Sequence, residues 1–415
     1  TKTLTPPFPS GQSTFTVVFA PTSPGTLQLQ VNAAADLRDV GGNPLDTTSA
    51  IADDTTITIN AGNTPPATIT GTAGGNDSWN TAANWDTNVV PFGPGSAIVD
   101  TLAKITNPAP SYTGSLSLTS GSTLQLVNRN ALAVLQTPSD ITLNTGSTLD
   151  ILDGSPDLGA IALAGNGRVT LRGNGAHHET IDFNGVVSGP GSLFINGVNN
   201  DTFNINAANT FGGGFFTSSD ADQGFRVNAK ANGALGTGDV TIGGSATLEV
   251  STGLGDVIGD SASLDLVGNK DSRRASKLIL GSNESIGAFY LEGVKQPGGT
   301  YGAIGSGAGT ETALITGSGI LTVPVEVLSI VIAEASPSNG PTVSWLVTFD
   351  GALTGLTASN FALNASGVSG AGITTVVAGA GNSTYTVTAD SFSGCGTLGL
   401  SLMNDTGTSP PISNE

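Results

Sequence analysis

The chain has few of the residues on which many functions depend: one cysteine, one methionine and two histidines in 415 residues. One cysteine cannot form an intramolecular disulfide, and so few Cys and His side chains leave no zinc-binding set and few general bases. The 13 lysines and arginines face 32 acidic residues. The resulting net charge of −19 repels polyphosphate, so we expect no nucleic-acid partner. No apolar run approaches the roughly 18 residues of a membrane helix, so we expect no membrane-spanning segment.

Glycine and apolar residues are plentiful, with 59 glycines and 38% hydrophobic residues against 11% charged ones. Disordered chains combine low hydrophobicity with dense charge, so this chain is expected to fold. Low cysteine and lysine contents with many small polar residues are common in bacterial extracellular proteins. We therefore expect an extracellular or cell-surface location in a bacterium.

Short alternating runs of apolar and polar residues cover the chain, as in residues 14–19 and 343–349, whereas no sustained helical pattern is present. The pattern predicts an all-β protein. In the middle of the chain, the phrase at 121–126 (GSTLQL) recurs at 146–151 (GSTLDI), and related strands follow. A spacing of roughly 20 to 25 residues is typical of one turn of a β-solenoid, in which each turn covers the apolar face of the next. A β-sandwich with degenerate turns stays open as the alternative.

The two ends of the chain repeat each other. Residues 13–17 (STFTV) return as 383–387 (STYTV) at an offset of 370, and residues 25–29 (GTLQL) return as 396–400 (GTLGL) at an offset of 371. The N-terminal copy continues to a further strand at residues 55–59, and the C-terminal copy stops without it. We expect a window of a tandem array, or subunits completed by a strand of the next copy. Chance similarity between threonine-rich strands is the alternative.

This organisation predicts four regions. Residues 1–62 form the second half of an immunoglobulin-like segment, 63–110 a linker with the start of the solenoid, 111–324 the β-solenoid, and 325–415 an immunoglobulin-like segment without its last strand. The residues expected to act in assembly are Ser13, Phe15, Val17, Ile57, Ile59, Tyr385, Val387, Leu398 and Leu400.

Several motifs carry a family likeness over roughly residues 70–323. They are residues 79–91 (WNTAANWDTNVVP), 184–193 (NGVVSGPGSL), 209–213 (NTFGG), 234–240 (ALGTGDV), 296–301 (QPGGTY) and 317–323 (GSGILTV). In this order they resemble the autotransporter-associated β-strand repeat, a passenger-associated repeat region of bacterial surface proteins. The resemblance implies a right-handed β-helix. Residues 325–415 resemble bacterial immunoglobulin-like surface repeats through 343–349 and 356–361, and the resemblance implies spacer or adhesive modules.

Signals for catalysis are weak. Gly259, Asp260 and Ser261 match part of a serine-protease nucleophile motif, with His177 and His178 as possible bases, but the fourth motif position is alanine, which favours a turn between solenoid strands. Adjacent histidines on a strand point to opposite faces, so a solvated loop is favoured over a metal site.

A β-helix polysaccharide hydrolase or lyase is the serious enzymatic alternative, with Arg168, Arg172 and Asp182 on or beside successive strands. We favour solvent-facing alternation for these side chains, and therefore no enzymatic activity.

A calcium site is a second possibility, because Asp36, Asp39, Asn43 and Asp46 crowd one turn. No EF-hand or calcium-binding repeat is present, so an acidic surface is favoured, and we expect no other cofactor.

Three tryptophans and the cysteine complete the candidates. We expect Trp79 and Trp85 to cap the start of the solenoid, with sugar stacking as the alternative, and Trp345 to lie in a sandwich core. Cys395 has no expected reactive role. The sequence thus predicts a right-handed β-solenoid flanked by immunoglobulin-like segments. Its expected function is that of an extracellular structural protein assembling head-to-tail into a fibre, filament or stalk, with an adhesin for carbohydrate or a cell-surface ligand as the alternative.

Overall fold

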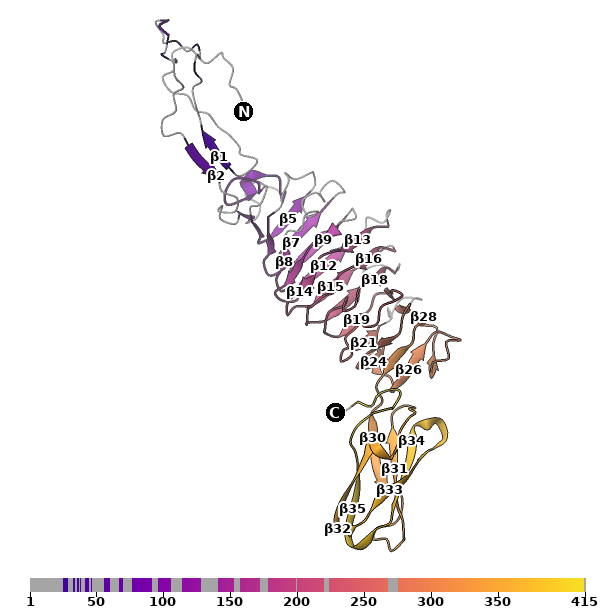
Figure 1. Ribbon diagram of the computed structural model, residues 1–415. Helices are drawn as coiled ribbons and strands as arrows, with labels where there is room; N and C mark the ends of the chain where they lie inside the picture. Colours follow the sequence, from indigo (N-terminus) through magenta and orange to yellow (C-terminus); the bar gives the residue numbers. More distant parts are fainter. Residues whose placement is uncertain are drawn as a thin grey trace.

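The computed structural model describes residues 25–28, 33, 36, 38, 42–44, 46, 56–59, 67–69, 77–91, 96–105, 114–127, 141–152, 157–171, 178–198, 200–219, 224–267 and 275–413. Within these ranges the helices are single 3-10 turns at Ala82–Asn84, Ala358–Asn360 and Ala380–Asn382. The prediction of an all-β protein is confirmed. None of the helices in these ranges has the length and apolar character needed to cross a membrane. Figure 1 shows a stack of strands in the middle of the molecule and a separate β domain at its C-terminal end.

The stack is a β-solenoid built from three long sheets, and its strands run parallel from turn to turn. The six-stranded sheet contains β3 (Ala67–Ile69), β4 (Ala97–Val99), β6 (Leu116–Leu118), β8 (Ile141–Leu143), β11 (Ile161–Leu163) and β14 (Val187–Ser188). The seven-stranded sheet contains β10 (Asp157–Leu158), β13 (Thr180–Phe183), β16 (Thr202–Ile205), β18 (Arg226–Ala229), β20 (Thr247–Val250), β22 (Lys277–Leu280) and β28 (Ile315–Gly317). The solenoid prediction is confirmed, and its right-handed sense stays a prediction.

The third long sheet has ten strands, of which the last two form an antiparallel hairpin. Its strands are β5 (Leu102–Ile105), β7 (Thr123–Leu126), β9 (Thr148–Ile151), β12 (Arg168–Leu171), β15 (Leu193–Asn196), β17 (Phe215–Ser218), β19 (Val240–Ile242), β21 (Ser263–Leu266), β24 (Ala288–Leu291) and β25 (Val294–Lys295). A small sheet follows it, made of β23 (Glu284–Ser285), β29 (Leu321–Val323), β26 (Gly299–Gly302) and β27 (Thr310–Glu311).

The repeated phrase GSTLxx corresponds to one turn of the solenoid. Thr123 of β7 lies opposite Thr148 of β9, so the two copies of the phrase are neighbours in the same sheet. Gly121 and Gly146 precede these strands with φ of 76° and 72°, a left-handed conformation that glycine adopts without a Cβ clash. The repeated glycine therefore marks the corner at which each turn enters its next strand.

A single apolar core runs through the solenoid from Trp79 to Val323. Alternate residues of most strands point inward, as in β7 and β9, where Leu124 and Leu149 are fully buried. These inward side chains form one continuous cluster along the stack. Burial of apolar surface stabilises the solenoid by about 25 cal/mol for each Å² removed from water.

The two tryptophans lie at the start of the solenoid, as the sequence predicts. Trp79 and Trp85 are buried, with their rings edge to face at 4.7 Å between centroids, and the Trp85 indole N–H donates to the Trp79 carbonyl at 2.8 Å. The backbone N–H of Trp79 donates to the backbone carbonyl of Lys104 in β5. β4 and β5 pair with β6 and β7, so the stack includes strands of residues 63–110, the region in which the sequence predicts the start of the solenoid.

The C-terminal domain, residues 325–413, consists of two sheets. The four-stranded sheet has the order β30 (Val327–Ile332), β31 (Val343–Phe349), β34 (Thr384–Asp390) and β33 (Gly372–Ala378). The second sheet pairs β32 (Phe361–Ser369) with β35 (Ser393–Leu402). Both sheets contribute to one core, which includes Val347, Tyr385 and Phe361. Trp345 is buried, as predicted.

The solenoid meets the C-terminal domain through a hydrogen-bonded junction. The Asp350 carboxylate accepts the Gly298 N–H at 2.9 Å and the Glu326 N–H at 2.7 Å, and Lys295 pairs with Glu326. A Cβ added at Gly351 would lie 1.8 Å from the Gly298 carbonyl oxygen, so the two backbones approach as closely as glycine allows. These contacts fix the domain to the end of the solenoid.

Candidate functional site

The candidate site of the C-terminal domain is the open edge of β35, one of four strands with a single described neighbour, the others being β30, β33 and β32. β34 is hydrogen-bonded on both sides, to β31 and to β33. β35 pairs with β32 alone among the residues that the structure describes. An unpaired edge presents a row of backbone N–H and C=O groups that another strand can bind.

The repeated segments at residues 383–387 and 396–400 belong to different sheets, because the chain crosses from one sheet to the other between β34 and β35. Tyr385 and Val387 of β34 are buried, and the Tyr385 hydroxyl donates to the Leu353 carbonyl at 2.5 Å. The structure places both residues in the domain core on a central strand, and their role in assembly stays a prediction.

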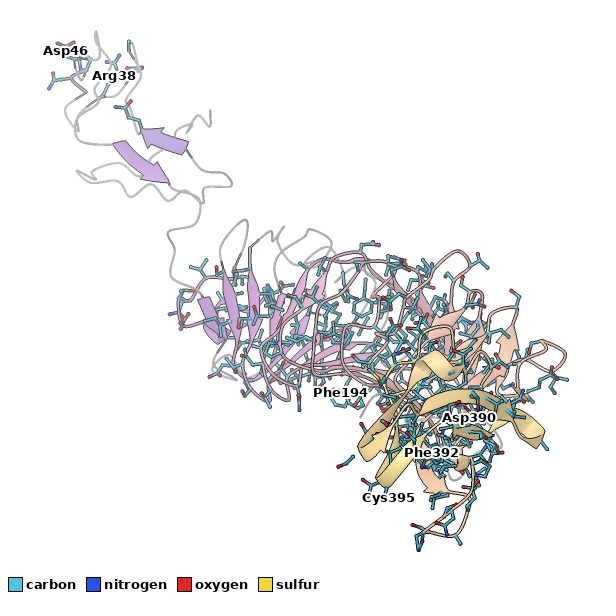
Figure 2. The ribbon with its side chains drawn as sticks, turned by 60° about the horizontal axis from the view of Figure 1, so that its bottom comes forward. Arg38, Asp46, Phe194, Asp390, Phe392 and Cys395 are labelled. Carbon is cyan, nitrogen blue, oxygen red and sulfur yellow. The ribbon has the colours of Figure 1, made fainter. Side chains whose placement is uncertain are left out.

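β35 combines an exposed end with an apolar one. Residues 393–397 are exposed, whereas Leu400 and Leu402 pack against the domain core and Leu398 is half-buried. The only cysteine, Cys395, is an exposed free thiol on this strand (Figure 2). Leu398 and Leu400 thus lie on a strand with an open edge, and their role in assembly stays a prediction.

The N-terminal copy of the repeated segment has the neighbour that β35 lacks. β1 (Gly25–Gln28) pairs antiparallel with β2 (Thr56–Ile59), with Gly25 opposite Ile59 and Leu27 opposite Ile57. β1 corresponds to positions 396–399 of β35, because both begin the phrase GTLxL. Ile57 and Ile59 lie on β2, whereas Ser13, Phe15 and Val17 lie outside the described residues.

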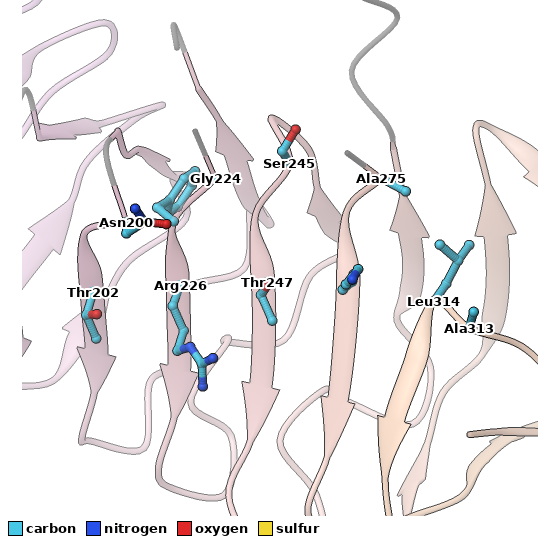
Figure 3. Close-up of a pocket in the computed structure, with 11 residues that line it drawn as sticks. Asn200, Thr202, Gly224, Arg226, Ser245, Thr247, Ala275, Ala313 and Leu314 are labelled. Carbon is cyan, nitrogen blue, oxygen red and sulfur yellow. The ribbon is translucent and has the colours of Figure 1, made fainter. Parts of the chain in front are cut away.

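A polar groove crosses the outer face of the seven-stranded sheet (Figure 3). It has a volume of about 600 Å³. Thr202, Arg226, Thr247 and Lys277 form a row across it, because they are register partners on β16, β18, β20 and β22. Arg226 pairs with Glu249. Because Glu249 counters the Arg226 charge, the threonine hydroxyls and the Lys277 ammonium supply the hydrogen-bond donors and positive charge of this surface.

The next row of the same face is a ladder of hydrogen-bonded side chains. The Asn204 amide donates to Asp182 at 2.8 Å, and the Asn228 amide donates to the Asn204 side-chain oxygen at 2.9 Å. The ladder ends at Glu249, because a glutamate side chain has no N–H group to donate to Asn228. Glu249 pairs with Arg226 instead.

The enzymatic alternative needs two converging carboxylates. Asp182 and Glu249 are three strands apart, about 14 Å at the usual strand spacing. The paired carboxylates of glycosidases lie about 5 to 9.5 Å apart, so these two do not form such a pair. The Arg168 side chain and the whole of Arg172 lie outside the described residues.

Two buried carboxylates accept hydrogen bonds from backbone N–H groups that include groups of the neighbouring coil of the solenoid. Glu284 accepts the Val257 N–H at 3.1 Å and the Ile258 N–H at 2.9 Å, and burial raises the pKa of Glu284 to about 7 against these donors. Asp201 accepts the N–H groups of Glu179 and Val198, and burial raises its pKa as well. Both carboxylates satisfy buried backbone donors and hold neighbouring solenoid turns together.

The calcium prediction falls largely on residues of which little is described. Asp36 accepts a hydrogen bond from Arg38 at 2.9 Å, Asn43 and Asp46 are exposed, and Asp39 lies outside the described residues (Figure 2). Within the described ranges no group of three or more His, Cys, Asp or Glu residues is arranged to hold a metal ion. Calcium stays a prediction, and thermal unfolding with calcium and with a chelator tests it: no shift in melting temperature excludes the site.

The remaining candidates have structural places. Gly259 and Ala262 close a turn before β21, with the Ala262 N–H donating to the Gly259 carbonyl at 2.8 Å, so the Ser261 motif is a turn between solenoid strands. His178 is exposed, and His177 lies outside the described residues. Trp79 and Trp85 are too deeply buried to offer a ring face to a sugar. Comparisons with protein-family models, curated proteins and solved structures found no match to this chain.

Proposed function

We propose that the protein is an extracellular structural protein, a unit of a surface fibre or stalk whose units join head-to-tail by strand completion. The observation that carries this proposal is the open edge of β35. The same chain contains β2, which pairs with β1, the N-terminal counterpart of β35. The composition supports the extracellular location through its low cysteine and lysine contents and its many small polar residues.

The strand order of the C-terminal domain supports an immunoglobulin-like sandwich. Such a sandwich has one sheet of order A-B-E-D and another of order C-F-G. With β30 to β35 taken as A to F, the order β30-β31-β34-β33 corresponds to A-B-E-D, and β32-β35 corresponds to C-F. The G position beside β35 is the open one, and β1 with β2 has the antiparallel pairing expected of F with G.

The proposed mechanism is mechanical. Parallel ladders along the solenoid make a stiff element, and the Asp350 contacts continue it into the C-terminal domain. Contacts between unlike ends of identical units form open filaments when the geometry does not close into a ring.

Charge placed on one face of β2 tests the proposal. We expect the double variant Ile57→Lys and Ile59→Lys to prevent assembly, because two ammonium groups would enter the apolar side of the completed sheet. Thr56→Lys with Thr58→Lys is the matched control, since it adds the same charge to the alternate positions of the same strand. Electron microscopy and sedimentation give the readout, and circular dichroism checks that the solenoid is intact. Unchanged fibres in the isoleucine variant, or a wild-type protein that stays monomeric, would overturn the proposal.

The polar groove favours a second candidate function, binding of a carbohydrate or cell-surface ligand by an adhesin. The row of Thr202, Arg226, Thr247 and Lys277 supplies donors and positive charge on a protein that is otherwise acidic, which suits an anionic glycan. Glycan-array binding that is lost in Lys277→Ala and kept in Lys104→Ala would support it. Lys104 is a suitable control because it pairs with Asp77 in another sheet. Equal binding by both variants, or none by wild type, would count against this candidate.

A further inference from the structure

The register of strand completion can be derived by comparing β35 with β1. Both strands carry the phrase Gly-Thr-Leu-x-Leu, from Gly25 in β1 and from Gly396 in β35, and its last leucine follows the end of β1. β1 already has a partner, with Gly25 opposite Ile59, Thr26 opposite Thr58, Leu27 opposite Ile57 and Gln28 opposite Thr56. Because the two strands share this phrase, a strand such as β2 that pairs with β1 would find its glycine and leucine positions repeated on β35.

The face of β35 that meets the core fixes which residues of the incoming strand must be apolar. Leu400 and Leu402 pack against the domain core, and their partners on β32 are Leu363 and Phe361. Leu398 lies on the same face, because successive side chains of a strand alternate. A completing strand therefore needs an apolar side chain opposite Leu398.

We propose that β35 of one copy pairs antiparallel with residues 56–59 of a second copy, with Leu398 opposite Ile57 and Thr397 opposite Thr58. This inference rests on the proposed function and specifies its interface. The register places Ile57 and Ile59 on the core face, opposite Leu398 and Gly396, and places Thr56 and Thr58 on the outer face. A slip by one residue would turn the threonines toward the core, so the alternation selects against it.

The partner strand belongs to a second copy because β2 and β35 of one copy lie at opposite ends of the solenoid (Figure 1). The stack from β5 to β24 alone is about 38 Å long at the usual strand spacing. In the proposed assembly β2 leaves its own β1 and pairs with the similar edge of the neighbour's β35, an exchange of partners related to domain swapping.

Cysteine cross-linking in the full chain tests this register. Thr58→Cys and Thr397→Cys are introduced together in a Cys395→Ser background, which removes the exposed native thiol. Side chains directly opposite each other have Cβ atoms about 5 Å apart, within reach of a disulfide after a small adjustment. Under mild oxidation with oxidised glutathione we expect a ladder of covalent oligomers. Mixing the two single-cysteine variants should give the same cross-link as a dimer.

Thr56→Cys with Thr397→Cys is the matched control, because its Cβ atoms would be diagonal neighbours about 7 to 8 Å apart. We expect the Thr58 pair to give several times as much cross-linked product as the Thr56 pair. Equal or greater product from the Thr56 pair overturns the register. Filaments seen by electron microscopy with no cross-link from either pair also overturn the register and leave the proposed function standing. A protein that stays monomeric at every concentration overturns both.

Discussion

The solenoid and the C-terminal domain are both made of strands, yet they satisfy their sheet edges differently. The inner strands of the solenoid have a neighbour on both sides, parallel except for β25 beside β24, and most of their inward side chains are fully buried. In the C-terminal domain β35 has one neighbour, and half of the strand is exposed. In the stack most strands lie between two others and few are at an end, whereas in the C-terminal domain four of the six strands are at a sheet edge.

The largest expected effect comes from the solenoid core. Phe203 is fully buried and packs edge to face on Phe225 at 5.7 Å, so Phe203→Ala is expected to lower the free energy of unfolding by about 3 to 5 kcal/mol. Urea denaturation followed by circular dichroism measures it. A loss below about 1 kcal/mol would show that the turns repack around the cavity.

The second prediction concerns Glu284, a buried carboxylate of the solenoid. Burial raises its pKa from the ordinary value of 4.5 to about 7 in the folded protein. The folded state binds the proton of Glu284 more tightly, so this contribution to stability is present below pH 4.5 and is lost as the pH rises to 7. The expected loss is up to about 3 kcal/mol. Urea midpoints of wild type and Glu284→Gln between about pH 4.5 and 7.5 measure it. The variant should lack this part of the decline, and parallel curves would contradict the assignment.

The junction between the two regions gives a smaller effect. Asp350→Ala leaves the N–H groups of Gly298 and Glu326 without their acceptor, which is expected to cost about 1 to 3 kcal/mol. The solenoid and the C-terminal domain should then unfold at separate temperatures in calorimetry, and small-angle scattering should show a wider range of shapes. A variant with an unchanged single transition would indicate that the junction does not couple the two regions.

The smallest effect is expected on the outer face of the four-stranded sheet. Val377 is 57% exposed, and Val377→Thr keeps its shape, so the change in unfolding free energy should stay within about 0.5 kcal/mol. The same substitution at the buried Val227 serves as the contrast and should destabilise the protein clearly, because it places a hydroxyl in the solenoid core. Similar effects at both sites would remove the distinction between the two regions.

The fold of the solenoid could be predicted because its signals are local and repeated. Thr123 and Thr148 hold the same place in successive copies of one phrase and lie side by side in the sheet, so the repeat itself states which strands are neighbours. The pairing within the C-terminal domain has no such repeat. Residues 383–387 and 396–400 are recognisable as strands, but their alternation does not show that they belong to different sheets.

The candidate site was only partly predictable. The shared phrase GTLxL indicated that β35 and β1 are equivalent, and the structure adds that β35 has an open edge and that the strand of Tyr385 and Val387 does not. The capping roles of Glu284 and Asp201 have no sequence signal, because each is a single acidic residue. Their backbone partners include groups in the neighbouring turn of the solenoid, far away along the chain.

The sequence by itself determined that the chain is all β, that its middle repeats one strand phrase at solenoid spacing, and that its two ends carry related strands. These properties follow from alternation, glycine corners and recurrence, which are legible in short segments of the chain. Tertiary structure alone decided which strands are edge strands, β35 among them, and which carboxylates are buried. Both depend on partners far apart in the chain, and hydrogen bonds between distant strands leave no local pattern.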